Sequence, residues 1–215
     1  MSLHQAKKIS IVLVVIISLV VPHNAYAHAG DYFAGHYTSN APRDQHNMIL
    51  RIESSATTAI LTSSVYLAAT SWNSISSNVG VSVVFSAPGM SINGCTYVYG
   101  QTYTDGTLGV TSVYDYNGNP TSANSDWKYV TITMNTLSTA FGTGSEVQDR
   151  AKKTFVHEVG HALKLSHPEH NSSLIMHDNN GYPVAIMNQG YPNGIYIQSG
   201  ICYHDKLNLQ TKWGN

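Results

Sequence analysis

Apolar and polar residues alternate along several short stretches of this chain, which is the pattern of strands with one buried face. The clearest is 127–134, where Trp127, Tyr129, Thr131 and Thr133 alternate with Lys128, Val130, Ile132 and Met134. The stretch 79–85 is rich in β-branched residues and is ended by Ala-Pro-Gly. The predicted strands are 48–52, 79–85, 96–104, 107–114 and 127–134, with an Asp105-Gly106 turn between the third and fourth.

Other stretches repeat their apolar residues near the 3.6-residue period of an amphipathic helix. The predicted helices are 57–73, 146–163 and 204–213. Ser145 and Gln148 have the spacing of a capping box with Ser145 as the N-cap. Glu146 and Asp149 would lie in the first turn, where the helix dipole favours negative charge. One buried stripe is predicted for this helix, formed by Phe155, Val156, Val159, Ala162 and Leu163.

The first 27 residues have the pattern of a secretory signal peptide. Lys7 and Lys8 precede an apolar run at 9–21, and Ala-Tyr-Ala at 25–27 fits a cleavage site. The run is shorter than the roughly 20 residues that span a bilayer, although an uncleaved anchor is the alternative. We therefore expect a secreted, extracellular protein without stable membrane association, in which 28–215 form a single domain.

Charge argues against nucleic acid as a partner. Loss of Lys7 and Lys8 leaves nine basic residues against twelve acidic ones, a formal net charge of −3. No basic patch with interleaved aromatic residues is present in the sequence. Export would permit a disulfide between Cys95 and Cys202, but the sequence leaves that pairing open.

Residues 157–167 read His-Glu-Val-Gly-His-Ala-Leu-Lys-Leu-Ser-His. His157 and His161 are four apart, so on a helix they share a face and can bind one metal ion. His167 adds a third ligand if the helix ends and the chain turns back. Three histidines with an open fourth position are typical of catalytic zinc, and Glu158 stands where a general base can reach a water there. Chance is the competing explanation, but three His and one Glu seldom coincide at fixed offsets.

With this ligand set, the chain resembles the metzincin zinc metalloproteases, and among them the catalytic domain of the matrixins. Their motif is HExxHxxGxxH followed by a methionine turn. Trp72 and the closing Asp205…Lys212-Trp213-Gly214 add to the resemblance, which covers most of 46–214. It implies an α+β metzincin-like zincin fold: a twisted mixed sheet, a long helix, a zinc-binding active-site helix and a C-terminal helix.

Lys164 departs from the family motif, because it stands where metzincins have glycine. The resemblance implies a sharp turn there with positive φ, which costs a non-glycine residue about 1–2 kcal/mol. Zinc binding on the order of 10 kcal/mol can offset that cost. We expect the Lys164 side chain to point to solvent, and Lys164→Gly to stabilise the fold by no more than about 1 kcal/mol.

The family's methionine turn has two candidates, Met187 and Met176. Met176 lies nine residues after His167, and Met187 lies eighteen residues before Asp205. Each interval resembles the matrixin spacing on its own side. Met187 is preferred, because Asn-Asn-Gly-Tyr-Pro at 179–183 reads as a looped-out turn.

Resemblance and residue chemistry together predict a zinc-dependent endopeptidase. Zinc would activate water, and Glu158 would act as general base. An extended polypeptide substrate would pair with an exposed edge strand, for which the candidate residues are Thr107, Leu108, Gly109 and Val110. Two alternatives stay open: a non-catalytic zinc-folded binding protein, and a zinc amidase acting on cell-wall material.

Calcium is a second candidate cofactor, at the polar stretch 115–119. Asp115, Asn117 and Asn119 place oxygen-bearing side chains at alternate positions. Pro120 occupies the position where an EF-hand needs glycine, and Asp126 replaces the bidentate glutamate. An ordinary polar turn is therefore the preferred interpretation.

Overall fold

The alternating pattern of the strands becomes a five-stranded mixed sheet in the computed structural model, which describes residues 31–38, 41, 43–90, 94–168, 185–187 and 201–215. Its strands are β1 (Met48–Ile52), β2 (Val81–Phe85), β3 (Thr96–Gln101), β4 (Gly109–Tyr114) and β5 (Tyr129–Asn135). Their order across the sheet is β2-β1-β3-β5-β4. All neighbours pair in parallel except β4, which runs antiparallel to β5 at one edge.

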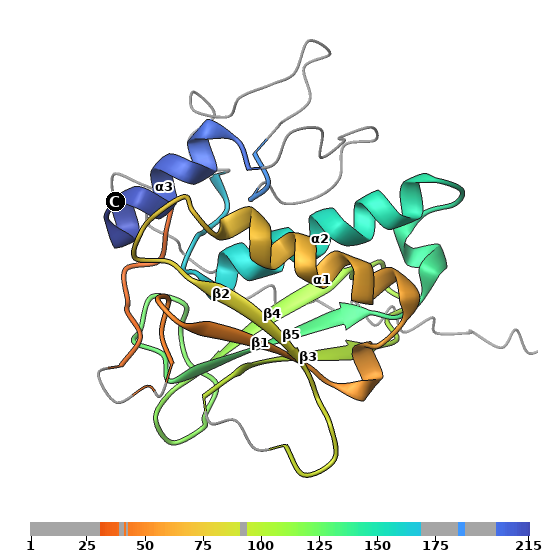
Figure 1. The fold of residues 1–215 in the computed structure, drawn as a ribbon, viewed down its shortest axis with the longest axis horizontal. Helices are drawn as coiled ribbons and strands as arrows, with labels where there is room; N and C mark the ends of the chain where they lie inside the picture. Colours follow the sequence, from red (N-terminus) through yellow and green to blue (C-terminus); the bar gives the residue numbers. More distant parts are fainter. Residues whose placement is uncertain (1–30, 39–40, 42, 91–93, 169–184, 188–200) are drawn as a thin grey trace, which may run out of the picture.

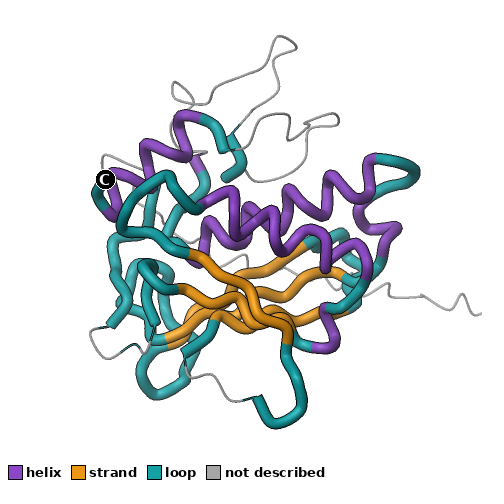
Figure 2. The backbone as a smooth tube through the Cα atoms, viewed as in Figure 1, coloured by secondary structure: helices purple, strands orange, loops and turns teal. Residues whose placement is uncertain are grey.

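The helices are α1 (Ala59–Trp72), α2 (Glu146–Ala162) and α3 (Tyr203–Trp213), with short 3-10 turns η1 (Ser54–Ala56) and η2 (Ser138–Phe141). Figures 1 and 2 show α1 and α2 together on one side of the sheet. Each strand turns alternate side chains toward them, so Leu50, Val98 and Ile132 are buried. The α+β class, with a mixed sheet and three helices, is therefore confirmed.

Two of the local predictions were wrong. Ser145 has helical φ/ψ and makes no capping hydrogen bond, while the Gln148 side chain donates to Ser63 Oγ at 3.1 Å on α1. A side-chain N-cap is found at α1 instead, where Thr58 Oγ1 accepts the Leu61 N–H. The predicted turn is present, with φ of +90° at Gly106, but β3 and β4 do not pair because β5 lies between them.

The two large helices are joined at their buried faces. The Trp72 indole N–H, at the end of α1, donates to the Val156 carbonyl of α2 at 2.9 Å. A Cβ added to Gly160 would collide with Met187 Sδ and lie 2.9 Å from the Trp72 ring. Gly160 thus lets the 185–187 segment and α1 approach the part of α2 that carries the histidines.

The signal-peptide prediction falls on residues outside the described ranges. Within those ranges, every helix is too short or too polar to cross a bilayer. The segment 31–38 packs along the turn that follows α2. Tyr32 forms an isolated antiparallel β-bridge with Leu165, and the Phe33 N–H donates to the Lys164 carbonyl at 2.7 Å.

Candidate metal centre

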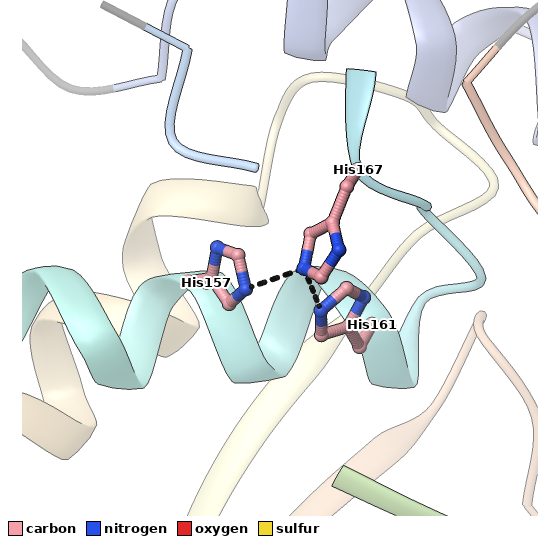
Figure 3. A group of neighbouring side chains, drawn as sticks. All are labelled: His157, His161 and His167. Atoms are coloured by element: carbon pink, nitrogen blue, oxygen red, sulfur yellow. Dashed lines mark hydrogen bonds between the residues drawn. The ribbon is translucent and has the colours of Figure 1, made fainter. Parts of the chain in front are cut away.

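His157 and His161 project from one face of α2, and His167 returns toward them from the loop beyond it (Figure 3). Nε2 of His167 lies 3.1 Å from Nε2 of His157 and 2.9 Å from Nε2 of His161. One ligand atom from each ring lies within 4.8 Å of the others. The structure therefore brings together all three histidines that the motif predicted.

The turn that returns His167 is a Schellman motif built around a lysine. The Leu165 N–H donates to the Gly160 carbonyl at 3.0 Å, and the Lys164 N–H donates to the His161 carbonyl at 2.9 Å. Lys164 has φ of +73°, which confirms the left-handed conformation expected at the glycine position. This conformation ends the helix and redirects the chain toward the histidines.

The Lys164 side chain does not point to solvent, so that expectation was wrong. The residue is fully buried. Its Nζ lies 3.3 Å from the centre of the Trp127 ring and donates to the Ser125 carbonyl at 2.8 Å. Burial lowers the pKa of Lys164 to about 6. The left-handed backbone directs the Lys164 side chain inward, where it packs on the Trp127 indole and donates to the Ser125 carbonyl.

Backbone carbonyls fix the tautomer of two of the rings. Nδ1 of His157 lies 2.8 Å from the Ile186 carbonyl, and Nδ1 of His161 lies 2.8 Å from the Leu165 carbonyl. Because a carbonyl oxygen only accepts, each Nδ1 carries the proton and each Nε2 presents a lone pair. Burial lowers the pKa of His157 to about 4, and that of His161 well below its usual value. Both rings are therefore neutral near pH 7, as metal ligands must be.

The close approach of the three histidine Nε2 atoms is explained better by a bound cation than by hydrogen bonds between the rings. The two lone pairs face Nε2 of His167, which has at most one proton to donate. Four tetrahedral bonds of about 2.0–2.1 Å would separate the nitrogens by roughly 3.3 Å, close to the two short separations found. Three imidazoles around an open position are the donor set of catalytic zinc. The residues present thus fit the zinc ion that the sequence predicted.

Glu158 lies beside the first histidine and is almost fully buried. Its Oε2 accepts a 2.6 Å hydrogen bond from the Thr111 hydroxyl on β4. Burial raises the pKa of Glu158 to about 7, against the lowering effect of the Thr111 bond. A carboxyl group with that pKa can both accept and return a proton near neutral pH.

The candidate substrate strand lies at the sheet edge nearest Glu158. Gly109 and Val110 belong to β4, whereas Thr107 and Leu108 precede it. A Cβ on Gly109 would lie 2.9 Å from Glu158 Cγ and Oε1, so a larger residue where β4 passes α2 would displace the Glu158 side chain. Val110 is exposed. Thr111, which contacts the candidate base directly, was not singled out in the sequence, where a lone threonine in a strand carries no signal.

Met187 is buried against Gly160, between the two histidines along α2. Met176, the other candidate, lies outside the described residues. The preceding residue, Ile186, accepts from His157 through its carbonyl and donates its N–H to Asp205 Oδ2 at 2.7 Å. Asp205 on α3 therefore holds the 185–187 segment, whose Ile186 carbonyl orients His157, a role that only the tertiary structure reveals.

The structure also describes the two cysteines and the polar stretch 115–119. Cys95 and Cys202 are not joined by a disulfide, and the Cys202 thiol donates to Asp205 Oδ2. The Asp115 carboxylate accepts the N–H groups of Asn117 and Asn119, as the polar-turn interpretation predicts. Within the described ranges, the three histidines are the one group of side chains placed to hold a metal ion.

Comparisons with known proteins add little to this geometry. No protein-family model and no curated protein matches the sequence. Among solved structures, the chain is similar to one titled "Crystal structure of myroilysin", with a TM-score of 0.44 and 12% sequence identity. The alignment covers 87% of this chain and 93% of that one. A likeness this distant carries no argument about activity.

Proposed function

We propose that this chain is a secreted zinc-dependent endopeptidase of the matrixin-like metzincin type. The observation that carries the proposal is the convergence of His157, His161 and His167 beside a buried glutamate. Zinc, when bound there, supplies Lewis-acid chemistry that polarises a carbonyl group and acidifies water. The proposal takes 28–215 as the mature domain, with the leader removed after Ala27.

The residues around the histidines divide the remaining work. Glu158 takes a proton from the attacking water and returns it to the leaving amine, while the Thr111 hydroxyl holds the carboxylate. An extended substrate pairs with β4, whose outer edge has no partner strand among the described residues. Met187 serves as the methionine turn, because it packs beneath the helix between the two ligands.

A non-catalytic zinc protein would have no use for this glutamate. Burying a carboxyl group costs free energy, and Glu158 is buried with one hydroxyl partner directed at it. The burial of Glu158 therefore costs folding free energy, and a catalytic role explains why the residue is there. Amide bonds in cell-wall material remain the alternative substrate, because the same histidines and glutamate would serve that reaction.

Matched substitutions test the proposal on the purified mature chain. His161→Ala should lose the zinc, found at about one ion per chain in the wild type. Glu158→Gln keeps the shape but cannot accept the proton, so it should retain zinc and lose roughly a hundredfold or more in rate. Casein and purified cell-wall material serve as the two substrates. Full zinc retention in His161→Ala, or wild-type cleavage by Glu158→Gln, contradicts the proposal.

A further inference from the structure

The sheet face turned away from α1 and α2 carries a groove of about 1010 Å³. Val98 and Ile132 are buried beneath the helices, so the alternate residues of β3 and β5 face the opposite way. Four tyrosines and two threonines define what is here named the tyrosine groove: Tyr97, Tyr99, Tyr114, Tyr129, Thr131 and Thr133. Glu158 and the histidines lie on the other side of the sheet, so the groove is separate from the metal centre.

The register explains why this face is hollow. Tyr97 and Tyr99 on β3 stand opposite Thr131 and Thr133 on β5. The threonines form a low floor because their side chains are short, while the tyrosines rise beside it. Tyr129, two residues before Thr131, pairs across the ladder with Tyr114 and raises a second aromatic wall at one end of the floor.

The tyrosine rings are held in fixed planes before any ligand arrives. Tyr97 and Tyr99 lie 6.2 Å apart with their planes 15° from parallel. Tyr114 and Tyr129 lie 4.8 Å apart with their planes 9° from parallel. Tyr99 is 39% exposed. Rings restrained in this way lose little conformational freedom when they stack against a ligand.

The groove is close to neutral. Among the described residues, Lys128 is the one charged residue that lines the groove. Its Nζ already donates to the Tyr116 carbonyl and lies over the Tyr116 ring. Arg51, which lies over the Tyr97 ring, is paired with Glu53 at 2.8 Å. A nucleic acid would also stack on tyrosines, but it needs more cations than this surface offers.

A peptide strand has no backbone to pair with here. β3 and β5 are interior strands, and their N–H and C=O groups are directed along the sheet toward neighbouring strands. A ligand of this face must therefore use the aromatic faces, the threonine hydroxyls and the Gln101 amide. A sugar ring matches that set, because it presents an apolar face of C–H groups and a rim of hydroxyls.

We propose that the tyrosine groove binds a neutral polysaccharide chain, with sugar rings stacked on the tyrosines and hydroxyls bonded to the threonine floor. The volume is at the upper end of the range for small-ligand pockets, which suits several linked sugars. The inference does not depend on the proposed peptidase activity. Polysaccharide binding in the groove would anchor the protein to a glycan matrix while leaving the candidate metal centre open.

Binding of the zinc-loaded mature chain to insoluble polysaccharides tests the proposal. The probes are cellulose, chitin and starch, with alginate beads as a polyanionic comparison. The wild type should be retained on at least one neutral polysaccharide in moderate salt. Tyr97→Ala/Tyr99→Ala should weaken that association about tenfold or more, as expected for the loss of aromatic contacts. Tyr99→Phe should bind like the wild type, because its ring still stacks.

Tyr66→Ala is the matched control, since Tyr66 is exposed on α1 outside the groove. It should keep wild-type binding, and all variants should keep wild-type zinc content and melting temperature. The proposal is overturned if no neutral polysaccharide retains the protein, or if only alginate does and salt releases it. Equal binding by Tyr97→Ala/Tyr99→Ala would also overturn it. The proposal is also overturned if the wild type is a dimer and the Tyr99→Ala variant is a monomer, because the groove would then be a contact between copies.

Discussion

At the scale of single residues, the Thr111 hydroxyl is the group that holds Glu158. Its single proton is shared between Glu158 Oε2 at 2.6 Å and the Glu158 backbone carbonyl at 3.1 Å. A hydrogen bond to a charged partner contributes about 1.5–3 kcal/mol. Removal of the Thr111 hydroxyl leaves the Glu158 carboxylate without its side-chain partner. The carboxylate is then freer to leave the position in which we propose that it accepts the proton.

Thr111→Val should therefore lower kcat by roughly tenfold or more while zinc content stays at the wild-type level. Thr111→Ser keeps the hydroxyl and should restore most of the rate. Steady-state kinetics on a peptide substrate and zinc analysis of the same samples measure both effects. A Thr111→Val enzyme as fast as the wild type would remove Thr111 from the site.

Lys164 gives a second residue-scale prediction, opposite in sign to the one made from the sequence. Glycine would relieve about 1–2 kcal/mol of left-handed strain. It would also delete a buried stem packed on Trp127 and the bond to Ser125, and losing a large buried side chain costs about 2–5 kcal/mol. Lys164→Gly should therefore destabilise the zinc-loaded protein by about 1–3 kcal/mol.

Lys164→Met is the control, because methionine keeps most of the stem and has the same backbone strain. It should be markedly more stable than Lys164→Gly in a thermal melt. A glycine variant that melts above the wild type would mean that strain outweighs the buried contacts. His167 should still bind zinc in both variants, because the left-handed turn is retained.

At the scale of elements, the contact between α2 and the 185–187 segment passes through Gly160. Helix propensity alone favours alanine over glycine by about 1 kcal/mol. Because the added Cβ would collide with Met187 Sδ, we expect Gly160→Ala to destabilise the fold instead, by about 1–3 kcal/mol.

A double-mutant cycle separates these two effects. Met187→Ala is destabilising alone, since it empties a buried position, but it makes room for the new methyl group. Gly160→Ala should therefore cost clearly less in the Met187→Ala background than in the wild type. Urea unfolding of the four proteins measures the coupling, and additive costs would show that Met187 does not limit position 160.

At the scale of the whole molecule, the N-terminal segment and α3 close around the metal centre. The Ser166 N–H donates to the Asp31 carbonyl at 3.0 Å. The Asp31 carboxylate lies 2.9 Å from His204 Nε2 on α3. Hydrogen bonds to Asp205 and Asp31 raise the pKa of His204 to about 9. Residues far apart in the chain thus hold the loop that carries His167.

This pairing predicts a pH dependence of stability. Protonated His204 favours the folded state, because its folded pKa lies above the unfolded value of 6.5. The contribution is complete below pH 6.5 and is lost as pH rises through about 9, with an upper bound of about 3 kcal/mol. Asp31→Asn should remove part of it, so the stability difference between pH 6 and pH 9.5 should shrink. Unfolding at both pH values measures this, and an unchanged difference contradicts the role of Asp31.

The sequence by itself determined the features that depend on local pattern. Alternation predicted the strands, and the 3.6-residue period predicted the helices. The offsets of His157, Glu158 and His161 indicated the candidate metal centre, since the two histidines are four apart on a helix and share a face. The positive φ at Lys164 was implied by the resemblance to the metzincin motif, in which glycine stands at that position.

Tertiary structure decided what depends on neighbours distant in the chain. β5 lies between β3 and β4 in the sheet although those two strands are neighbours in the sequence, and Gln148 bonds to Ser63 rather than capping its own helix. Lys164 turned inward because Trp127 and the Ser125 carbonyl were there to receive it. Thr111 and Asp31 contact the site only through folding. No local pattern encodes such contacts, because their free energy comes from partners that the fold alone brings together.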